Sequence, residues 1–117
     1  MKVSKSEVEL RKGSPSMSIK SYPSDLKELS VARIWVNGRH PNEEGAQFIE
    51  HKCNVLIYVI KGEGKVIIDG QEFEVKAEET VTIPSGQKYY IIGNVDYIAA
   101  TSPTYSREQN EVIKANK

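Results

Sequence analysis

The sequence has little of several features that identify a protein's class. Its single cysteine, Cys53, excludes an internal disulfide and fits a reducing compartment. The 16 basic and 16 acidic residues give a formal charge of zero, without the basic excess typical of nucleic-acid binders. No apolar run approaches the length of a membrane span, and residues 1–10 contain no apolar signal-peptide core. These absences predict a cytoplasmic protein that binds neither nucleic acid nor membrane.

The middle of the chain consists of short apolar runs separated by turn residues. Val55–Ile60 is nearly continuous apolar sequence, which favours a strand covered on both faces. Gly62 and Gly64 predict a sharp reversal into the next strand, and Asp69-Gly70 predicts a type I′ hairpin turn. The strands expected here cover residues 55–60, 65–68, 71–75 and 80–83. Such short, evenly spaced strands in one domain of 117 residues favour a β-sandwich or barrel.

The two ends of the chain are more polar than its middle. Further strands are expected at 30–36 and 91–100, the second interrupted at Gly93-Asn94. One helical turn is expected at 23–29, and a short helix at 106–114. Residues 1–21 predict either edge strands or a partly ordered tail.

Polarity alternates just before the central strand. Ile49, His51, Cys53 and Val55 fall on one face of an extended chain, and the residues between them fall on the other. We expect the first set to face the barrel interior, unless a bulge at Lys52-Cys53 turns His51 outward.

The turn residues carry a resemblance to a known family. The run from Gly38 to Pro103 resembles a cupin, whose two motifs are G-x5-H-x-H-x3/4-E-x6-G and G-x5-P-x-G-x2-H-x3-N. Gly62 matches the closing glycine of the first motif, and Pro84 and Gly86 match the P-x-G of the second. Counting from these anchors, the four positions that hold metal in many cupins are occupied by Ile49, His51, Val55 and Tyr89. Since isoleucine and valine cannot ligate an ion, no metal and no other cofactor are expected.

The sequence is also similar to a narrower group of small, uncharacterised RmlC-like cupins with a degenerate metal motif. The shared segments are Gly38-Arg39-His40-Pro41, Cys53 and Lys88-Tyr89-Tyr90. The resemblance implies an all-β fold, a single double-stranded β-helix or jelly-roll barrel with short N- and C-terminal extensions. We place the barrel at 30–103, an N-terminal extension at 1–29 and a C-terminal tail or short helix at 104–117. By the same resemblance, the N-terminal strands are expected to contribute to a homodimer contact.

The leading functional hypothesis is a metal-free cupin that binds a small molecule of sugar or small-acid type. The ligand would lie inside the barrel and be reached past Arg39. The expected lining residues are Arg39, Ile49, His51, Cys53, Val55, Ile57, Tyr89 and Ile91.

Two alternatives remain open at this point. The first is a cofactor-independent sugar isomerase or epimerase, with His51 as base and Tyr89 as acid, by resemblance to cupin enzymes that move a proton next to a carbonyl. The second is a structural or regulatory dimer in which side chains fill the barrel.

Overall fold

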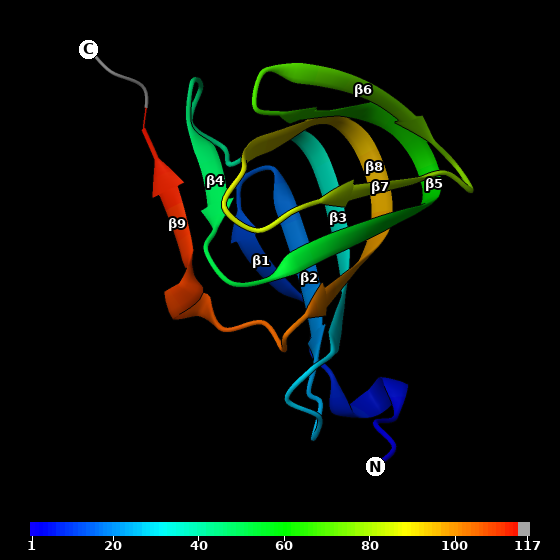
Figure 1. The fold of residues 1–117 in the computed structure, drawn as a ribbon. Helices are drawn as coiled ribbons and strands as arrows, with labels where there is room; N and C mark the ends of the chain where they lie inside the picture. Colours follow the sequence, from blue (N-terminus) through cyan, green and yellow to red (C-terminus); the bar gives the residue numbers. More distant parts are fainter. Residues whose placement is uncertain (115–117) are drawn as a thin grey trace.

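The structure, a computed structural model, describes residues 1–114 and is built almost entirely of β-strands (Figure 1). This confirms the predicted all-β jelly roll. Its strands are β1 (Arg11–Ser14), β2 (Met17–Tyr22), β3 (Ser30–His40), β4 (Gln47–Glu50), β5 (Asn54–Ile68), β6 (Gln71–Lys76), β7 (Thr80–Ile83), β8 (Lys88–Ser102) and β9 (Asn110–Ile113). Two short 3-10 helices, η1 (Lys5–Glu7) and η2 (Arg107–Gln109), complete the described part. Within residues 1–114, no helix combines the length and the apolar character needed to cross a bilayer.

The long strand β8 lies in the middle of the curled sheet. It pairs antiparallel with β3 along one edge and with β5 along the other. After the loop at 41–46, β4 pairs with the beginning of β8, on the same side of β8 as β3. Phe48 lies opposite Tyr89 in this pairing. β5 also pairs antiparallel with β6 and with β7. The curled sheet in Figure 1 therefore has an inner face that strands from the whole chain share.

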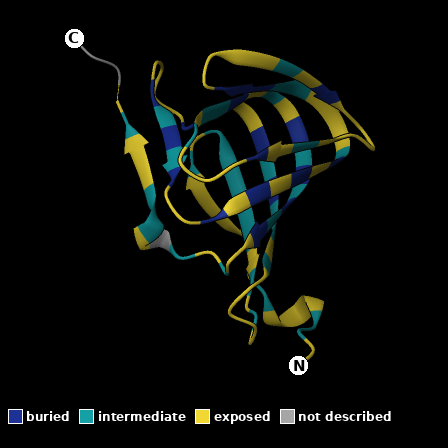
Figure 2. Cartoon of the chain, viewed as in Figure 1, coloured by how far each residue is buried: buried dark blue, intermediate teal, exposed yellow. Residues whose placement is uncertain are grey.

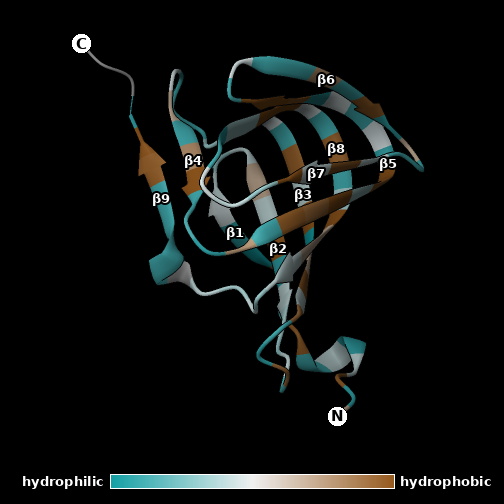
Figure 3. Ribbon diagram, viewed as in Figure 1, coloured by the Kyte–Doolittle hydropathy of each residue, from teal (hydrophilic) through white to brown (hydrophobic). Residues whose placement is uncertain are grey.

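The inner face is apolar because alternate residues of each strand point inward. In β5, Val55, Ile57 and Val59 are buried, whereas Leu56 and Tyr58 between them are 42% and 38% exposed. The expectation that this strand is covered on both faces is therefore wrong for the described residues. The same alternation produces the banding of burial in Figure 2 and of hydropathy in Figure 3.

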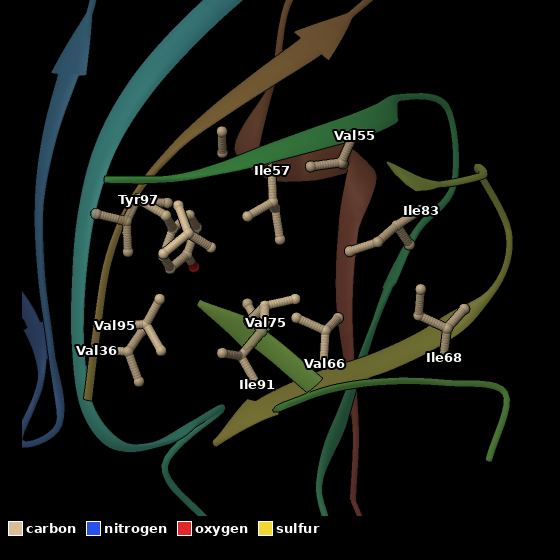
Figure 4. Packing of buried hydrophobic residues seen from close by; sticks show 13 residues of the cluster. Val36, Val55, Ile57, Val66, Ile68, Val75, Ile83, Ile91, Val95 and Tyr97 are labelled. Carbon is tan, nitrogen blue, oxygen red and sulfur yellow. The ribbon is translucent and has the colours of Figure 1, made fainter. Parts of the chain in front are cut away.

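The inward side chains pack into one cluster, drawn in Figure 4. Its labelled members are Val36, Val55, Ile57, Val66, Ile68, Val75, Ile83, Ile91, Val95 and Tyr97. They come from β3, β5, β6, β7 and β8, so the core ties together strands that are distant in sequence.

The glycines of the middle strands do not make the reversal that the sequence predicts. β5 runs without interruption from Asn54 to Ile68, and β8 from Lys88 to Ser102. Gly38, Gly93 and Gly64 lie in register across β3, β8 and β5. At Gly64 and Gly93 the two backbones approach closely as the sheet curls, and a side chain would not fit. The glycines thus permit a bend within long strands.

Both extensions of the barrel join the sheet. β1 and β2 form a hairpin whose second strand pairs with β3. Residues 23–29 contain bends but no helical turn. At the other end, the structure has η2 followed by β9 where the sequence predicted a short helix over 106–114. β9 pairs with the outer edge of β4. A helix at this place would have left the backbone groups along that edge without these hydrogen-bond partners.

Candidate functional site

Polar and aromatic side chains gather at one end of the barrel, where β4, the start of β8 and the segment 103–110 meet. We call this group the polar end, and its members are His40, Phe48, Glu50, Tyr89, Tyr105 and Asn110. The rings of His40 and Phe48 lie 4.6 Å apart between centroids, and those of Phe48 and Tyr89 lie 5.5 Å apart. Glu50 pairs with Asn110 across β4 and β9, and Asn110 Nδ2 donates to the Tyr105 hydroxyl over 3.5 Å. The group therefore combines aromatic faces with polar atoms.

Glu50 is the acidic residue of this group, and 3% of its surface is exposed. Its Oε1 accepts hydrogen bonds from the backbone amides of Lys52 at 3.0 Å and Cys53 at 3.1 Å. These bonds fix the carboxyl group against the turn that joins β4 to β5. Its Oε2 is buried and has no hydrogen-bond partner among the described residues. This oxygen therefore lacks a hydrogen-bond donor in the described part of the chain.

Asn110 presents a second acceptor on the same side of the sheet. Its Oδ1 is also buried without a partner among residues 1–114. Cross-strand neighbours in an antiparallel pair project their side chains to the same face. Asn110 and Glu50 are such neighbours, so their unpartnered oxygens belong to one local environment.

His40, Tyr89 and Tyr97 are held in their neutral forms. Burial lowers the pKa of His40 to about 4, so its imidazole is uncharged at neutral pH. Its Nδ1 is buried and has no partner in the described part of the chain. Burial, followed by the nearby Tyr105, Glu50 and Cys53, raises the pKa of Tyr89. Burial and then Tyr89 raise that of Tyr97, so both phenols keep their protons.

A family model described as a cupin domain matches residues 37–98, which is more than half of the chain. This chain belongs to the cupin family. The match includes β4, β5, β6, β7 and most of β8, and so covers much of the barrel and of the polar end.

One curated relative of this cupin is an uncharacterized protein of Methanocaldococcus jannaschii, 31% identical over 77 residues. The match covers 60% of this chain and 62% of the relative, so the chain spans less than two thirds of that protein's length.

Solved structures share the fold at low identity. Pac13 of Streptomyces, described as a unique nucleoside dehydratase, has a TM-score of 0.86 at 15% identity, covering 100% of this chain and 93% of its own. An RmlC-like cupin from Shewanella frigidimarina has a TM-score of 0.72 at 18% identity, covering 89% of this cupin and 91% of its own chain. KdgF from Halomonas has a TM-score of 0.72 at 14% identity, covering 89% and 94% respectively. At these identities the likeness shows the fold alone.

The structure does not place His51 inside the barrel of this cupin. His51 lies in the turn after β4, its side chain is 52% exposed, and its Nε2 lies 2.8 Å from Oε1 of Glu111 on β9. The predicted His51–Tyr89 pair is therefore wrong as an inward acid–base pair. The turn at 51–53 is the physical reason, since it breaks the alternation on which the prediction depended.

The same turn changes which residues of β4 face inward. Phe48 and Glu50 are buried, whereas Ile49 between them is only partly buried and pairs with Lys88 and Glu111. Ile49 was predicted to line the barrel and does not share the inner face of Phe48 and Glu50. Counting backward from β5 across the turn assigns β4 to the wrong face, and for that reason the sequence analysis missed Glu50.

Cys53 is fully buried but is directed toward the C-terminal segment. Its Sγ donates to the Pro103 carbonyl at 3.1 Å and lies 3.5 Å from Gln109 Oε1. Burial, with Glu50 nearby, raises the pKa of the thiol to about 11. The thiol is therefore protonated at neutral pH and helps attach the C-terminal segment to the barrel.

Arg39 is engaged within its own loop. Its Nη1 donates to the carbonyls of Pro41 at 2.9 Å and Glu43 at 2.7 Å. Its guanidinium also lies 4.2 Å from the centroid of the Tyr90 ring. These contacts give Arg39 a structural role in the loop between β3 and β4.

The remaining predicted lining residues, Val55, Ile57 and Ile91, are buried members of the core cluster, and Tyr89 packs against it. The structure thus brings these four onto the inner face. It separates them from His51, Ile49 and Arg39. Asn110 was missed because the sequence predicted a helix in place of β9.

Within residues 1–114, the positions matched to cupin metal ligands do not form a metal site. Of the four positions matched to cupin metal ligands, Val55 supplies no donor and His51 lies outside the barrel. Among residues 1–114, no group of three or more histidine, cysteine, aspartate or glutamate residues has an arrangement that could hold an ion. The side chains of the polar end supply hydrogen-bonding groups, among them the Glu50 carboxyl group and the Tyr89 hydroxyl group.

Two hollows lie elsewhere, alongside β6. One of about 380 Å³ is lined by Phe73, Val75, Thr80 and their neighbours, and one of about 580 Å³ by Glu63, Lys65, Lys76 and others. Neither contains a residue of the polar end, and both are open. We assign the candidate site to the polar end because the buried polar atoms without partners lie there.

Proposed function

We propose that this cupin binds a small organic molecule of sugar or small-acid type at the polar end, without a metal. One observation carries the proposal: Glu50 is 97% removed from solvent, yet its Oε2 has no partner among the described residues. A buried acceptor without a donor costs about 1–3 kcal/mol, so a fold retains it where a ligand or an ordered water supplies the donor.

The neighbouring side chains support an organic ligand. Phe48 and Tyr89 offer aromatic faces beside Glu50, and His40 adds a neutral ring. A small-molecule site typically combines apolar walls with a few oriented polar groups, and the polar end has both. Arg39, the cation that the sequence analysis assigned to the ligand, is bonded to loop carbonyls.

The fold is compatible with small-molecule chemistry in other proteins. Pac13 is described as a nucleoside dehydratase and has been solved with uridine, and another structural neighbour is an ectoine synthase from P. lautus. These are properties of those proteins, and the case for this chain depends on its own buried residues.

A second function is favoured by one feature of the site. Neutral His40, the carboxyl group of Glu50 and protonated Tyr89 gather in one environment, a combination able to accept and donate a proton. The isomerase or epimerase alternative would then use His40 or Glu50 as base and Tyr89 as acid. His51 would have no part in it.

The third possibility, a dimer with a filled barrel, draws support from the apolar cluster that occupies the inner face. The predicted homodimer contact through the N-terminal strands remains a prediction, and β1 is an edge strand at which such a contact would form.

The test is to release small molecules from untagged, natively purified protein by denaturation and to identify them by mass spectrometry, with elemental analysis in parallel. We expect an organic molecule that wild type retains and that Glu50→Gln loses. Glu28→Gln is the matched control, because it makes the same change at an exposed residue of the segment before β3 and should retain the molecule. A stoichiometric transition metal, or equal retention by Glu50→Gln, would contradict the proposal.

A further inference from the structure

We propose that β9 is part of the binding site, and that the ligand is an uncharged, hydroxylated molecule of sugar or polyol type. In this arrangement Oε2 of Glu50 and Oδ1 of Asn110 each accept a hydrogen bond from a ligand hydroxyl group. The inference rests on the proposed function and adds a ligand class and a second binding strand to it.

The position of β9 brings Asn110 to the site. Gln47–Glu50 pairs antiparallel with Asn110–Ile113, and Glu50 and Asn110 are direct partners in this register. The Cβ atoms of such partners lie about 4.5–5.5 Å apart and their side chains share a face. Two hydroxyl groups on adjacent atoms of one small molecule can therefore reach both side chains.

The chemistry of the unpartnered atoms selects the ligand. Both oxygens are buried acceptors without a donor in the described chain. A carboxylate or phosphate ligand would direct its own acceptor oxygens at them, which leaves both sides unsatisfied. Hydroxyl groups supply the missing donors, and the carbon skeleton of a sugar ring can pack against the aromatic side chains of Phe48 and Tyr89.

Several contacts hold β9 over this end of the barrel. His51 N donates to the Gln109 carbonyl at 2.9 Å, and Cys53 Sγ contacts Pro103 and Gln109. His51 Nε2 meets Glu111 at 2.8 Å, and Lys114 Nζ meets Glu43 Oε2 at 3.6 Å. Exposed His51 therefore has a structural role outside the barrel, because it helps to attach β9, the strand that carries Asn110.

The test is ligand-observed NMR with two defined panels. The first contains D-ribose, D-xylose, D-glucose and myo-inositol, and the second contains acetate, D-gluconate, inorganic phosphate and ethanolamine. Affinities are then measured for wild type, Asn110→Leu and Ile113→Val. Ile113 is the matched control because it lies on β9 opposite Gln47, and the alternation along the strand places it on the other face from Asn110. Amide hydrogen exchange in β4 and β9 checks that the strand stays docked in each variant.

We expect wild type to bind at least one member of the first panel and none of the second. Asn110→Leu should weaken that binding about tenfold or more, since a hydroxyl group loses its buried acceptor. Ile113→Val should leave it within about twofold. Binding confined to the second panel, or unaffected by Asn110→Leu while β9 remains protected, would overturn the inference.

The failure of this inference can be separated from failure of the proposed function. If the copurified molecule depends on Glu50 but not on Asn110, the site stands and the role of β9 is wrong. If the copurified molecule depends on Glu50 but carries no hydroxyl group, and no member of the first panel binds, the ligand class is wrong. If no molecule depends on Glu50, the proposed function itself fails.

Discussion

Gly64 and Gly93 lie opposite each other across β5 and β8, where the two backbones leave no room for a side chain. A Cβ on Gly93 would lie 2.6 Å from the Gly64 Cα and 2.7 Å from the Glu63 carbonyl oxygen. A Cβ on Gly64 would lie 2.5 Å from the Ile92 carbonyl oxygen. Since these neighbours are backbone atoms of paired strands, they cannot move aside without separating β5 from β8.

Gly93→Ala should therefore destabilise the barrel strongly. Gly93 has φ +137°, which L side chains rarely adopt, and the added methyl group meets rigid backbone. Strain and overpacking together predict a loss of about 2–5 kcal/mol in the free energy of unfolding. Urea denaturation monitored by circular dichroism measures this loss.

Gly70→Ala separates the two contributions. Gly70 also has a positive φ, +82°, but a Cβ there meets nothing within 4 Å. We expect a cost of about 1 kcal/mol, from the backbone conformation alone. Equal losses in the two variants would show that crowding between β5 and β8 contributes nothing.

The sequence predicted the fold well because the turn chemistry and the alternation of apolar residues both survive into the structure. Asp69-Gly70 does join β5 to β6, and Val55 and Ile57 do face inward. The lengths of the strands were not predictable in the same way. Gly62, Gly64 and Gly93 are compatible with a turn or with a close crossing of strands, and only the paired neighbours decide between them.

The site was predicted less well, because it depends on the orientation of β4. A pattern of period two carries no information across an irregular turn, and residues 51–53 form such a turn. Counting through it selected His51 and Ile49 where the fold presents Phe48 and Glu50. Asn110 could not be found from local sequence, since its position follows from pairing with β4, about 60 residues earlier.

His40 should make the barrel sensitive to acid. Its pKa falls to about 4 in the folded state because of burial, below the ordinary value of 6.5. Between these values the unfolded chain binds more protons than the folded one, so stability falls as the pH is lowered from about 6.5 to 4. A shift of this size corresponds to roughly 3 kcal/mol.

Chemical denaturation at about pH 7 and pH 4.5 measures this effect when wild type is compared with His40→Gln. We expect wild type to lose about 2–3 kcal/mol more than the variant, since glutamine has no proton to bind over this range. NMR of the His40 ring should show a neutral imidazole down to about pH 5. If wild type and variant lose equal stability, or if the ring protonates near 6.5, the buried environment assigned to His40 is wrong.

Cys53 should react slowly with a thiol-reactive disulfide reagent because two features protect it. Its side chain is fully buried beneath Pro103 and Gln109, and its pKa is raised to about 11. Since the thiolate is the reactive form, the native rate should rise about tenfold per pH unit between about pH 7 and pH 9.

A variant that ends at Ser102 removes the segment that covers Cys53, and its thiol should react about tenfold faster or more. Circular dichroism verifies that the barrel of this variant is folded. Removing residues 2–8, which include η1, is the matched control and should leave the rate unchanged. Rapid reaction of the intact native protein would mean that the C-terminal segment does not cover this end of the barrel, and would also weaken the case for β9 as part of the site.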